Sequence, residues 1–376
     1  MLDNVTFLLL ITRPTIKSNN FMEKQKKVAL LTLNYNSKQF LEVSVTSLLN
    51  QTYKNFEIFV IDNLSTDGSV EFLRERFPKT NYPKVNIISH TVNGGVGKGF
   101  NKVIKKIYKN YDYIGILDQD VKVDRNWLKE CISTLEKDPN NYICCPITYN
   151  WDGTVVDNVG GAIINILAGI FVGFLGDYKK QEIPEKYVDT EFKNLFAVAT
   201  AMVVKTQAFE EFGFYDEDYF IYFEEFDFSW RIVLGGKKVM CNTKALAYHY
   251  GHGSKYTKKV SLLLLKVSET NLFATYVKNL SLTSILFLIY PLLLFRILFS
   301  LFYLAISPGI TLAKLEGIGI FLKRWFTGQY GVARKFVSTV RKKSDIQVLS
   351  LNPNSIFSAA ISWFRTIGRF YNKAET

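Results

Sequence analysis

Cysteine is scarce in this sequence, and no cysteine or histidine spacing typical of a zinc site occurs. The four cysteines are Cys131, Cys144, Cys145 and Cys241, and the adjacent pair makes a poor disulfide framework. Free, buried thiols in a reducing compartment are therefore expected. No known DNA- or RNA-binding signature is present either, so a nucleic-acid partner is not expected.

Acidic residues are outnumbered by basic ones, and internal repeats and low-complexity segments are lacking. There are 46 Lys and Arg residues against 34 Asp and Glu residues, which gives a formal charge of +12. This excess favours a partner that carries phosphates, either a nucleotide or an anionic membrane face. Apolar residues make up 48% of the chain, which excludes disorder throughout. A chain of 376 residues can bury a large core and hold two domains.

The amino-terminal segment lacks the features of a membrane anchor or a signal peptide. Its apolar run, Val5–Ile11, is too short to span a bilayer, and no basic segment precedes it. Met22 begins a stretch that would be a natural start of the protein. We therefore treat residues 1–22 as a leader of unknown role.

Short apolar runs alternate with turns and helical patterns in the part that follows. The runs Val28–Leu33, Phe56–Ile61, Val85–Ser89 and Tyr113–Leu117 have the length and composition of buried strands. Helical spacing of apolar residues between them, as in Phe40–Leu49, predicts connecting helices. This alternation predicts an α/β fold with a mostly parallel, open, Rossmann-like sheet that has helices on both faces.

Polar side chains follow three of these predicted strands. They are Asn34 and Asn36, Asp62 and Asn63, and Asp118 and Asp120. The carboxyl ends of parallel strands meet at one edge of an open α/β sheet, where such sheets bind their ligands. Carboxylates spaced like Asp118 and Asp120 can hold Mg²⁺ or Mn²⁺, with substrate phosphates completing the coordination. An acidic turn that only closes a strand is the alternative for this pair, but the convergence of three strands favours a site.

A glycine-rich loop lies between Asn93 and Asn101. It is not a Walker loop, because Gly99 occupies the position of the required Ser or Thr. It is a poor dinucleotide fingerprint, since it follows the third strand and has the wrong glycine spacing. A turn that needs positive φ would explain only one or two of its four glycines. We therefore expect the loop to line the same site.

Carboxylates and aromatic residues crowd one segment of the second half of the chain. Glu224, Asp227 and Arg231 would share one face of a helix, and a salt-bridged amphipathic helix must explain part of this group. Carboxylates among aromatic residues would also have a raised pKa, which a general base needs. Farther along, His249 and His252 lie in a glycine-rich loop, which favours a site over buried structural imidazoles.

The ordered set of motifs resembles the nucleotide-binding half of family 2 glycosyltransferases, which have the GT-A fold. The matching stretches are Leu33–Asn36, Ser47–Tyr53, Val60–Asn63 with Ser65–Gly68, Asn93–Gly97 with Asn101, and Leu117–Asp120. The resemblance extends over residues 26–255, and its motifs are specific as a set and weak singly. The Asp-Gln-Asp form of the last motif, with Asn-Gly-Gly before it, is similar to the rhamnosyltransferase branch.

This resemblance implies a role for each matching residue. Contacts to a nucleoside diphosphate sugar would come from Asn34, Asn36, Asp62, Asn63, Asn93, Gly94, Gly95, Asn101 and Asp118. Asp118 and Asp120 would hold Mg²⁺ or Mn²⁺ on the diphosphate, with His249 as a third ligand. Glu225 occupies the position of the proposed base, with Glu224 and Asp227 as the next candidates. The family usually carries Asp there, so Glu225 is a departure.

The implied activity is the inverting, metal-dependent transfer of a sugar to a glycan or lipid-linked acceptor during cell-surface glycan synthesis. In the rhamnosyltransferase branch the sugar would be rhamnose. If the departure at Glu225 has disabled the base, the alternative is a membrane-docked protein that binds sugar nucleotides without turnover. The sugar, the nucleotide base and the acceptor do not follow from the sequence.

The carboxy-terminal third contains one long apolar run, Leu280–Ile306, whose length permits a membrane span. However, Arg296 near its middle would cost roughly 2.5–3.5 kcal/mol on insertion, and Pro291 would kink the helix. Eight basic residues against one acidic residue lie between Lys314 and Lys343, and a single crossing would carry them away from the cytosol. We therefore expect a peripheral or re-entrant region on the cytoplasmic membrane face.

A buried helical domain or a homo-oligomer interface is the alternative use of this run. The predicted organisation is a leader at 1–22, a GT-A domain at 23–255, and a helical, apolar and basic membrane-associating region at 256–376. Within the GT-A domain, residues 23–125 would bind the nucleotide sugar, and residues 126–255 would bind the acceptor.

Overall fold

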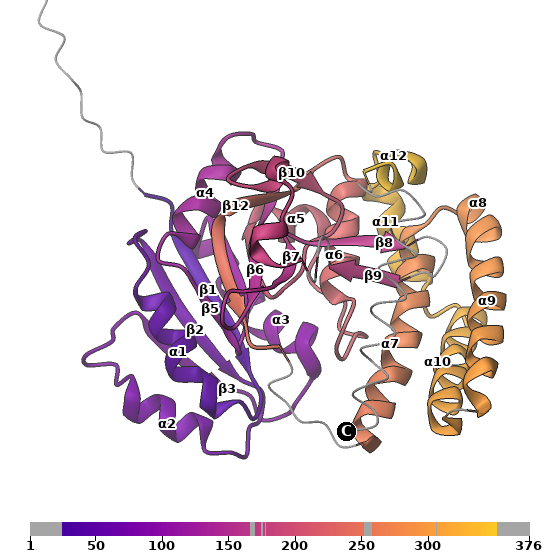
Figure 1. Cartoon of the computed structure of the whole chain (residues 1–376), viewed down its shortest axis with the longest axis horizontal. Coiled ribbons are helices and arrows are strands. Elements are labelled where there is room, and N and C mark those ends of the chain that lie inside the picture. The colour runs from indigo at the N-terminus through magenta and orange to yellow at the C-terminus, as the bar shows by residue number, and fades with distance from the viewer. Residues whose placement is uncertain are drawn as a thin grey trace, which may run out of the picture.

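The computed structural model describes residues 25–165, 170–173, 176, 178–251, 258–305 and 307–351. The leader expected at residues 1–22 lies outside these ranges, as does His252. A mixed sheet forms the centre of the molecule, and a group of helices from the last third of the chain stands beside it (Figure 1).

The first half of the sheet is parallel, as the alternation of strands and helices predicts. Its elements are β1 (Val28–Asn34), α1 (Lys38–Leu49), β2 (Phe56–Asp62), α2 (Ser69–Arg76), β3 (Val85–Ser89), α3 (Gly95–Ile107) and β4 (Tyr113–Asp118). The strands lie in the order β3-β2-β1-β4, and Asn34 at the end of β1 is level with Asp62 at the end of β2. The polar residues predicted at the strand ends therefore meet at one edge.

The second half of the sheet contains both parallel and antiparallel pairs. Its elements are β5 (Val121–Val123), α4 (Trp127–Glu136), β6 (Asn141–Asn150), β7 (Val156–Val159), β10 (Glu191–Asn194), β11 (Ala201–Lys205), α5 (Gln207–Phe212), α6 (Glu224–Leu234) and β12 (Lys238–His249). β11 lies antiparallel between β4 and β6, whereas β12 is parallel to β6 and also pairs with β5. A separate hairpin is formed by β8 (Ala162–Asn165) and β9 (Ile170–Gly173). The β12–β5 pairing places the end of β12 next to the turn after β4.

Apolar side chains of the parallel strands are buried on both faces of the sheet. In β1, Ala29 and Leu31 join one apolar cluster, and Val28 and Leu30 join another on the opposite face. A strand covered on both faces needs apolar residues at successive positions, which explains the continuous runs in the sequence.

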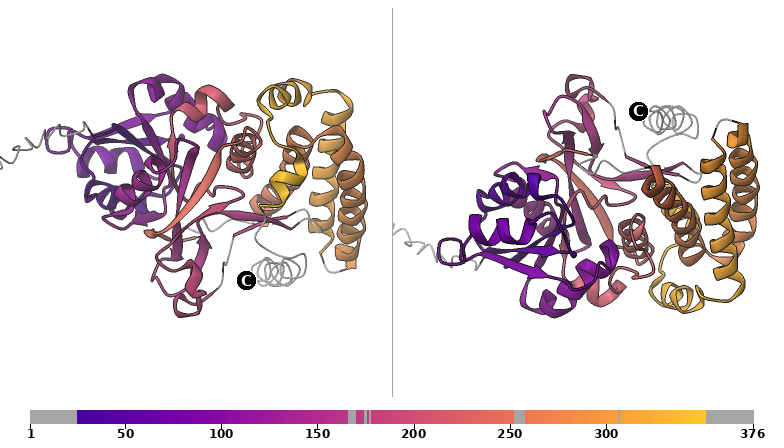
Figure 2. Two further views of the ribbon diagram at one scale, coloured as in Figure 1. Left: turned by 90° about the horizontal axis from the view of Figure 1, so that it is seen from above. Right: turned by 90° about the horizontal axis from the view of Figure 1, so that it is seen from below.

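The helical region is built on α7 (Lys258–Asn279). The following elements are α8 (Leu282–Ser284), a π-helical turn (Ile285–Ile289), α9 (Tyr290–Phe302), α10 (Pro308–Phe326), α11 (Gly331–Val340) and α12 (Asp345–Leu349). The π turn ends two residues before Pro291, which has no N–H and cannot make the regular helical bond. Helices α7, α9 and α10 stand together on one side of the sheet (Figure 2). Short 3₁₀ turns occur at Tyr108–Asn110, Lys180–Glu182, Glu185–Tyr187 and Tyr303–Ala305.

The sheet and the helical region share one apolar cluster. Trp230 of α6 meets Tyr276 of α7 at a ring-centroid distance of 5.7 Å. Phe273 of α7 and Phe321 of α10 belong to the same cluster as Ile116 of β4. The domain boundary at residue 255 stays a prediction, but the helices after it are packed onto the sheet by a common core.

Candidate functional site

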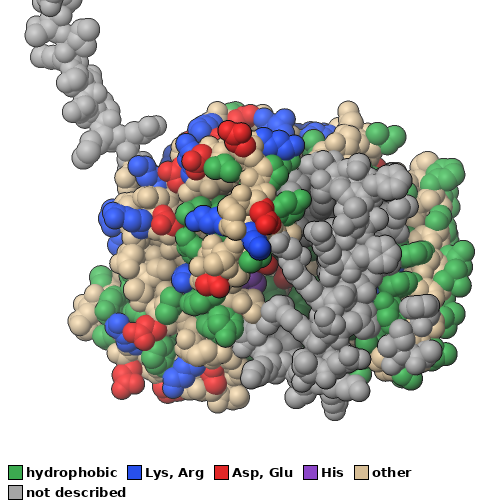
Figure 3. Space-filling model, viewed as in Figure 1, with side chains coloured by type: hydrophobic (Ala, Val, Ile, Leu, Met, Phe, Trp, Pro, Cys, Tyr) green, Lys and Arg blue, Asp and Glu red, His purple; other side chains and the backbone are tan. Residues whose placement is uncertain are grey.

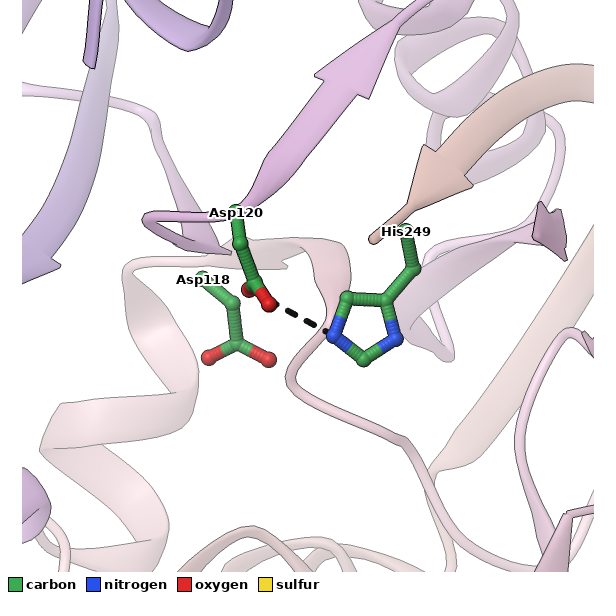
Figure 4. A group of neighbouring side chains, drawn as sticks. All are labelled: Asp118, Asp120 and His249. Carbon is green, nitrogen blue, oxygen red and sulfur yellow. Dashed lines mark ion pairs between the residues drawn. The ribbon is translucent and has the colours of Figure 1, made fainter. Parts of the chain in front are cut away.

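Three side chains with metal-binding groups come together at the ends of β4 and β12 (Figure 4). Asp118 is the last residue of β4, Asp120 lies in the turn that follows, and His249 is the last residue of β12. Their ligand atoms lie within 4.8 Å of one another, and Nε2 of His249 is 3.4 Å from Oδ1 of Asp120. The β12–β5 pairing aligns His249 with Val121 and so produces this arrangement. The fold thus brings together the metal-binding set that the sequence predicts.

A fourth side chain, Asp157 of β7, contacts the other nitrogen of the His249 imidazole. Oδ2 of Asp157 is 3.1 Å from Nδ1 of His249. A carboxylate on the second ring nitrogen fixes the orientation of a metal-binding histidine and directs its other nitrogen toward the ion. No motif surrounds Asp157, so the sequence alone did not predict this contact. Its contact depends on the pairing of β7 with β6, next to β12.

Burial and neighbouring charges shift the pKa values in this group. Burial raises the pKa of Asp118 to about 7; His249 opposes this effect, and Asp120 and Asp157 add to it. Burial would lower the pKa of His249, but its bonds to Asp120 and Asp157 raise it well above its usual value. The two carboxylates that contact His249 therefore favour the positively charged form of its imidazole. Two carboxylates and an imidazole are a suitable donor set for a divalent cation such as Mn²⁺ or Mg²⁺, whose charge would replace that of the imidazole.

Two further carboxylates reach this region from the start of α6. Burial, followed by Glu225 and Asp118, raises the pKa of Glu224 well above its usual value. Burial, reinforced by Asp118, raises the pKa of Glu225 to about 7. In the described part of the chain, neither Oε2 atom has a hydrogen-bond partner. Glu224 is only 4% exposed whereas Glu225 is half-buried, so Glu225 is the more accessible of the two side chains.

Asp227, the third catalytic candidate, makes structural bonds with both of its carboxylate oxygens. Oδ2 accepts a hydrogen bond from Nε of Arg231 at 3.1 Å, and Oδ1 accepts one from Nδ2 of Asn279 at 2.8 Å. All three side chains are buried. The Asp227–Arg231 pair is the salt bridge that the helical spacing predicts. Because both oxygens are already bonded, the structure does not support a direct catalytic role for Asp227. That role stays a prediction.

The ends of β1 and β2 are tied together by their own polar side chains. Nδ2 of Asn34 donates to Oδ1 of Asp62 and to Oγ of Ser65, both at 2.9 Å. Oδ1 of Asn36 accepts from the backbone N–H of Thr66 at 2.7 Å. The residues predicted to bind the donor are therefore neighbours, and their mutual bonds fix the loops that would surround it.

The glycine-rich loop is held from two sides. Nδ2 of Asn63 donates to Oδ1 of Asn93 at 2.9 Å, and the N–H of Gly95 donates to the same oxygen at 3.0 Å. On the other side, a Cβ atom at Gly95, where φ is +79°, would lie 2.0 Å from the carbonyl oxygen of Phe220. The close approach of the segment before α6 therefore requires glycine at this position.

Asn101 of α3 attaches the same segment to the loop. Its Nδ2 donates to the carbonyl oxygen of Tyr215 at 2.8 Å, and its Oδ1 accepts from the N–H of Tyr215 at 3.2 Å. The side chain is fully buried. Both the nitrogen and the oxygen of the Asn101 amide are hydrogen-bonded to Tyr215. A contact between Asn101 and a donor sugar therefore stays a prediction.

Sequence comparison matches just under half of the chain to a known family. Residues 30–212 match the description of glycosyl transferase family 2. A chondroitin synthase of Escherichia coli is 29% identical over 156 residues, which are 39% of this chain and 21% of that protein. A dTDP-rhamnosyl transferase, RfbG, of Shigella flexneri is 35% identical over 104 residues, which are 27% of this chain and 35% of that protein. The chain thus spans well under two thirds of the length of either relative.

Two solved structures resemble a large part of this chain. GalNAc-T7 with UDP, GalNAc and Mn²⁺ aligns with a TM-score of 0.52 at 16% identity, covering 67% of this chain and 48% of that one. The mannosyltransferase PcManGT of Pyrobaculum calidifontis, in complex with GDP-Man and Mn²⁺, aligns with a TM-score of 0.50 at 13% identity, covering 90% and 87%. These likenesses show the GT-A fold. Sequence match and fold agree: residues 30–212 of this chain match glycosyl transferase family 2, and the solved structures above share its GT-A fold.

Proposed function

We propose that this chain transfers a sugar from a nucleoside diphosphate sugar to a hydroxyl group of a glycan or lipid-linked acceptor, with inversion at the anomeric carbon. One observation carries the proposal. The ligand atoms of Asp118, Asp120 and His249 are grouped closely enough to hold a divalent cation, and the half-buried Glu225 lies close enough for Asp118 to raise its pKa. A cation for the diphosphate and a base for the acceptor are the two parts that such a transfer needs.

Each of these side chains has one role in the proposed reaction. A divalent cation held by Asp118, Asp120 and His249 would stabilise the negative charge on the leaving diphosphate. Asp157 keeps the imidazole of His249 in the orientation that presents Nε2. Ionised Glu225 accepts the proton of the acceptor hydroxyl, whose oxygen attacks the anomeric carbon from the face opposite the diphosphate.

The relatives support the choice of donor, cation and acceptor. The structures of GalNAc-T7 and PcManGT contain UDP or GDP-Man together with Mn²⁺. The Shigella relative is a dTDP-rhamnosyl transferase, so dTDP-rhamnose is our first candidate donor. Relatives named as a chondroitin synthase and a poly(ribitol-phosphate) glucosyltransferase favour an acceptor in cell-surface glycan synthesis.

A thermal-shift series tests donor and cation together. UDP-, GDP- and dTDP-sugars are added with Mn²⁺, Mg²⁺ or a chelator, and a ligand that binds the folded state raises Tm by mass action. We expect one nucleotide class to raise Tm only in the presence of a cation, and Asp120→Asn to abolish the cation-dependent part. Gln119→Asn, which alters the neighbouring side chain and keeps both carboxylates, is the control. A cation-independent shift, or none with any donor, would contradict the proposal.

Turnover separates an enzyme from a protein that only binds sugar nucleotides. Release of the nucleoside diphosphate is measured with a total lipid and glycan extract as the acceptor source. Wild-type release that is lost in Glu225→Gln supports transfer with Glu225 as the base. An inactive wild type together with an active Glu225→Asp would instead favour the binding protein.

We further propose that the helix Leu282–Leu301 lies on the cytoplasmic membrane face. Among the described residues, this is the one helix long and apolar enough to cross a membrane; its mean hydropathy is 2.2, and 22% of it is buried. Its exposed large apolar residues are Leu282, Leu286, Phe287, Tyr290, Leu294, Phe295, Leu298 and Leu301. Apolar side chains gather along this side of the molecule (Figure 3). A continuous apolar surface of this kind fits the acyl-chain boundary of a bilayer.

The opposite side of the same helix is bound to α7 and α10 through charged side chains. This attachment favours a helix that lies on the membrane over one that spans it. Nε of Arg296 donates to Oε1 of Glu269 in α7 at 2.7 Å, and Nζ of Lys314 in α10 is 3.4 Å from Oε2 of Glu269. All three side chains are buried. Spanning would withdraw Arg296 from this cluster, whereas docking keeps it. The net charge of +12 favours an anionic surface.

A further inference from the structure

Two consecutive residues before α6 adopt the left-handed backbone conformation. Tyr222 has a φ of 68° and Phe223 a φ of 78°. This conformation is unfavourable for residues with bulky side chains, so such a turn persists only where other contacts hold it. Phe223 is the N-cap of α6, and Glu224 and Glu225 are its first two residues. The turn therefore decides the direction in which both carboxylates leave the helix.

Asn271 of α7 makes the bonds that hold this turn. Its Nδ2 donates to the carbonyl oxygens of Ile221 and Tyr222, each at 3.0 Å. The Asn271 side chain is only 3% exposed, so its amide group would be left without a partner if these bonds were broken. If the backbone of Ile221 and Tyr222 changed its conformation, both hydrogen bonds would be lost and the buried amide of Asn271 would have no partner, which is unfavourable.

Contacts on two sides make the turn part of a rigid connection. On the sheet side, the carbonyl oxygen of Phe220 accepts a hydrogen bond from the N–H of Val96 in the glycine-rich loop at 2.7 Å. On the helix side, Lys278 of α7 pairs with Asp216 at 2.5 Å. The segment that leads into α6 is thus clamped between the glycine-rich loop and α7.

We propose that Asn271 is a positioning residue for glycosyl transfer, because its amide fixes the Tyr222–Phe223 turn and thereby sets the place of Glu225 relative to Asp118. This inference rests on the proposed function. Asn271 lies outside the family match at residues 30–212, in the helix that also anchors Arg296 through Glu269. Helix α7 therefore connects the Tyr222–Phe223 turn to the helices that form the proposed membrane-binding surface.

Comparison of Asn271→Ala with Thr270→Val tests the role of the amide. Thr270 precedes Asn271 in α7, but its hydroxyl donates to the carbonyl oxygen of Gly317 in α10 at 3.0 Å and not to the turn. We expect Asn271→Ala to lower kcat by on the order of 100-fold, since small misplacements of a reacting group have effects of this size. The affinity for donor and cation should stay within about twofold, because the donor side is untouched. Thr270→Val should lower Tm and keep kcat.

A second pair of variants separates the backbone conformation from general damage. Tyr222→Gly and Tyr222→Ala are each combined with Asn271→Ala. Both remove the ring of Tyr222, but only glycine adopts positive φ without strain. We expect the glycine combination to have a kcat several times that of the alanine combination. Equal kcat values in the two combinations, or a kcat unchanged by Asn271→Ala alone, would overturn the proposal.

Hydrogen exchange distinguishes a failure of this inference from a failure of the proposed function. Asn271→Ala should speed amide exchange in residues 221–226, whether or not transfer is detected, and Thr270→Val should not. Unchanged exchange in Asn271→Ala refutes the role of Asn271 alone. A wild-type protein that transfers no sugar from any donor refutes the proposed function and, with it, a positioning role in that reaction.

Discussion

At the scale of single residues, the environment of Glu225 makes the stability of the protein depend on pH. Burial and Asp118 raise its pKa from 4.5 to about 7. The folded state then holds the proton more tightly than the unfolded chain, so this stabilisation is complete below pH 4.5 and is lost as the pH rises through about 7. We expect Glu225 to contribute a fall of about 3 kcal/mol in the free energy of unfolding of the metal-free protein over this window, as measured by denaturant unfolding.

Glu225→Gln removes this titration and should reduce the fall. Its effect extends to Glu224, whose pKa is raised by burial first and by Glu225 next. Replacement of the exposed Glu185 by Gln is the control and should leave the pH dependence as in the wild type. An equal pH dependence in wild type and Glu225→Gln would show that Glu225 does not ionise in this range.

At the scale of helices, one buried acid joins α7, α9 and α10. Burial opposes the ionisation of Glu269, but Arg296 and Lys314 outweigh it and hold its pKa below the usual value. Burial lowers the pKa of Lys314 to about 8. Glu269→Gln would leave two buried cations without a counter-charge, so we expect the free energy of unfolding to fall by about 3–5 kcal/mol in a denaturant titration.

A surface pair between the same two helices provides the control. Lys266 of α7 and Glu316 of α10 are 3.2 Å apart, and their side chains are 30% and 47% exposed. Because exposed pairs contribute little, Glu316→Gln should lower the free energy of unfolding by no more than about 1 kcal/mol. Equal losses in Glu269→Gln and Glu316→Gln would mean that burial of the charge cluster is not what joins the helices.

At the scale of the whole molecule, the apolar surface of Leu282–Leu301 would determine where the protein works. We expect the purified protein to float with vesicles that contain anionic phospholipids, and less with neutral ones, because its net charge is +12. The double variant Leu294→Asp, Leu298→Asp places charges on this surface and should abolish flotation while keeping the donor-induced rise in Tm. Val188→Asp, at a position 50% exposed on the sheet domain, is the matched control.

Other occupants of this surface would give different results. A wild-type protein that does not float but forms a dimer, which the double variant dissociates, would assign the surface to a second copy of the chain. Resistance of the bound protein to alkaline extraction would indicate a membrane span in place of docking.

Much of the fold and the metal-binding set could be predicted because their signals are local. A strand buried on both faces needs a continuous apolar run, and β1, β2 and β4 have such runs. Parallel strands end at one edge, so Asp118 and Asp120 at the end of β4 were expected beside the ends of β1 and β2. His249 could be predicted as a metal ligand because it lies in a glycine-rich loop and matches a family motif.

Distant contacts could not be predicted, because they depend on packing and leave no spacing in the sequence. Asp157 and Asn271 stand in no motif, and each acquires its role from a partner brought near by the fold. Asn101 and Asp227 show the converse, since they match motifs but are engaged in structural bonds. The sequence by itself determined which strand ends surround the site. The packing of β7 and α7 alone decided which side chains hold the reactive groups in place, because hydrogen bonds form between groups that meet in space.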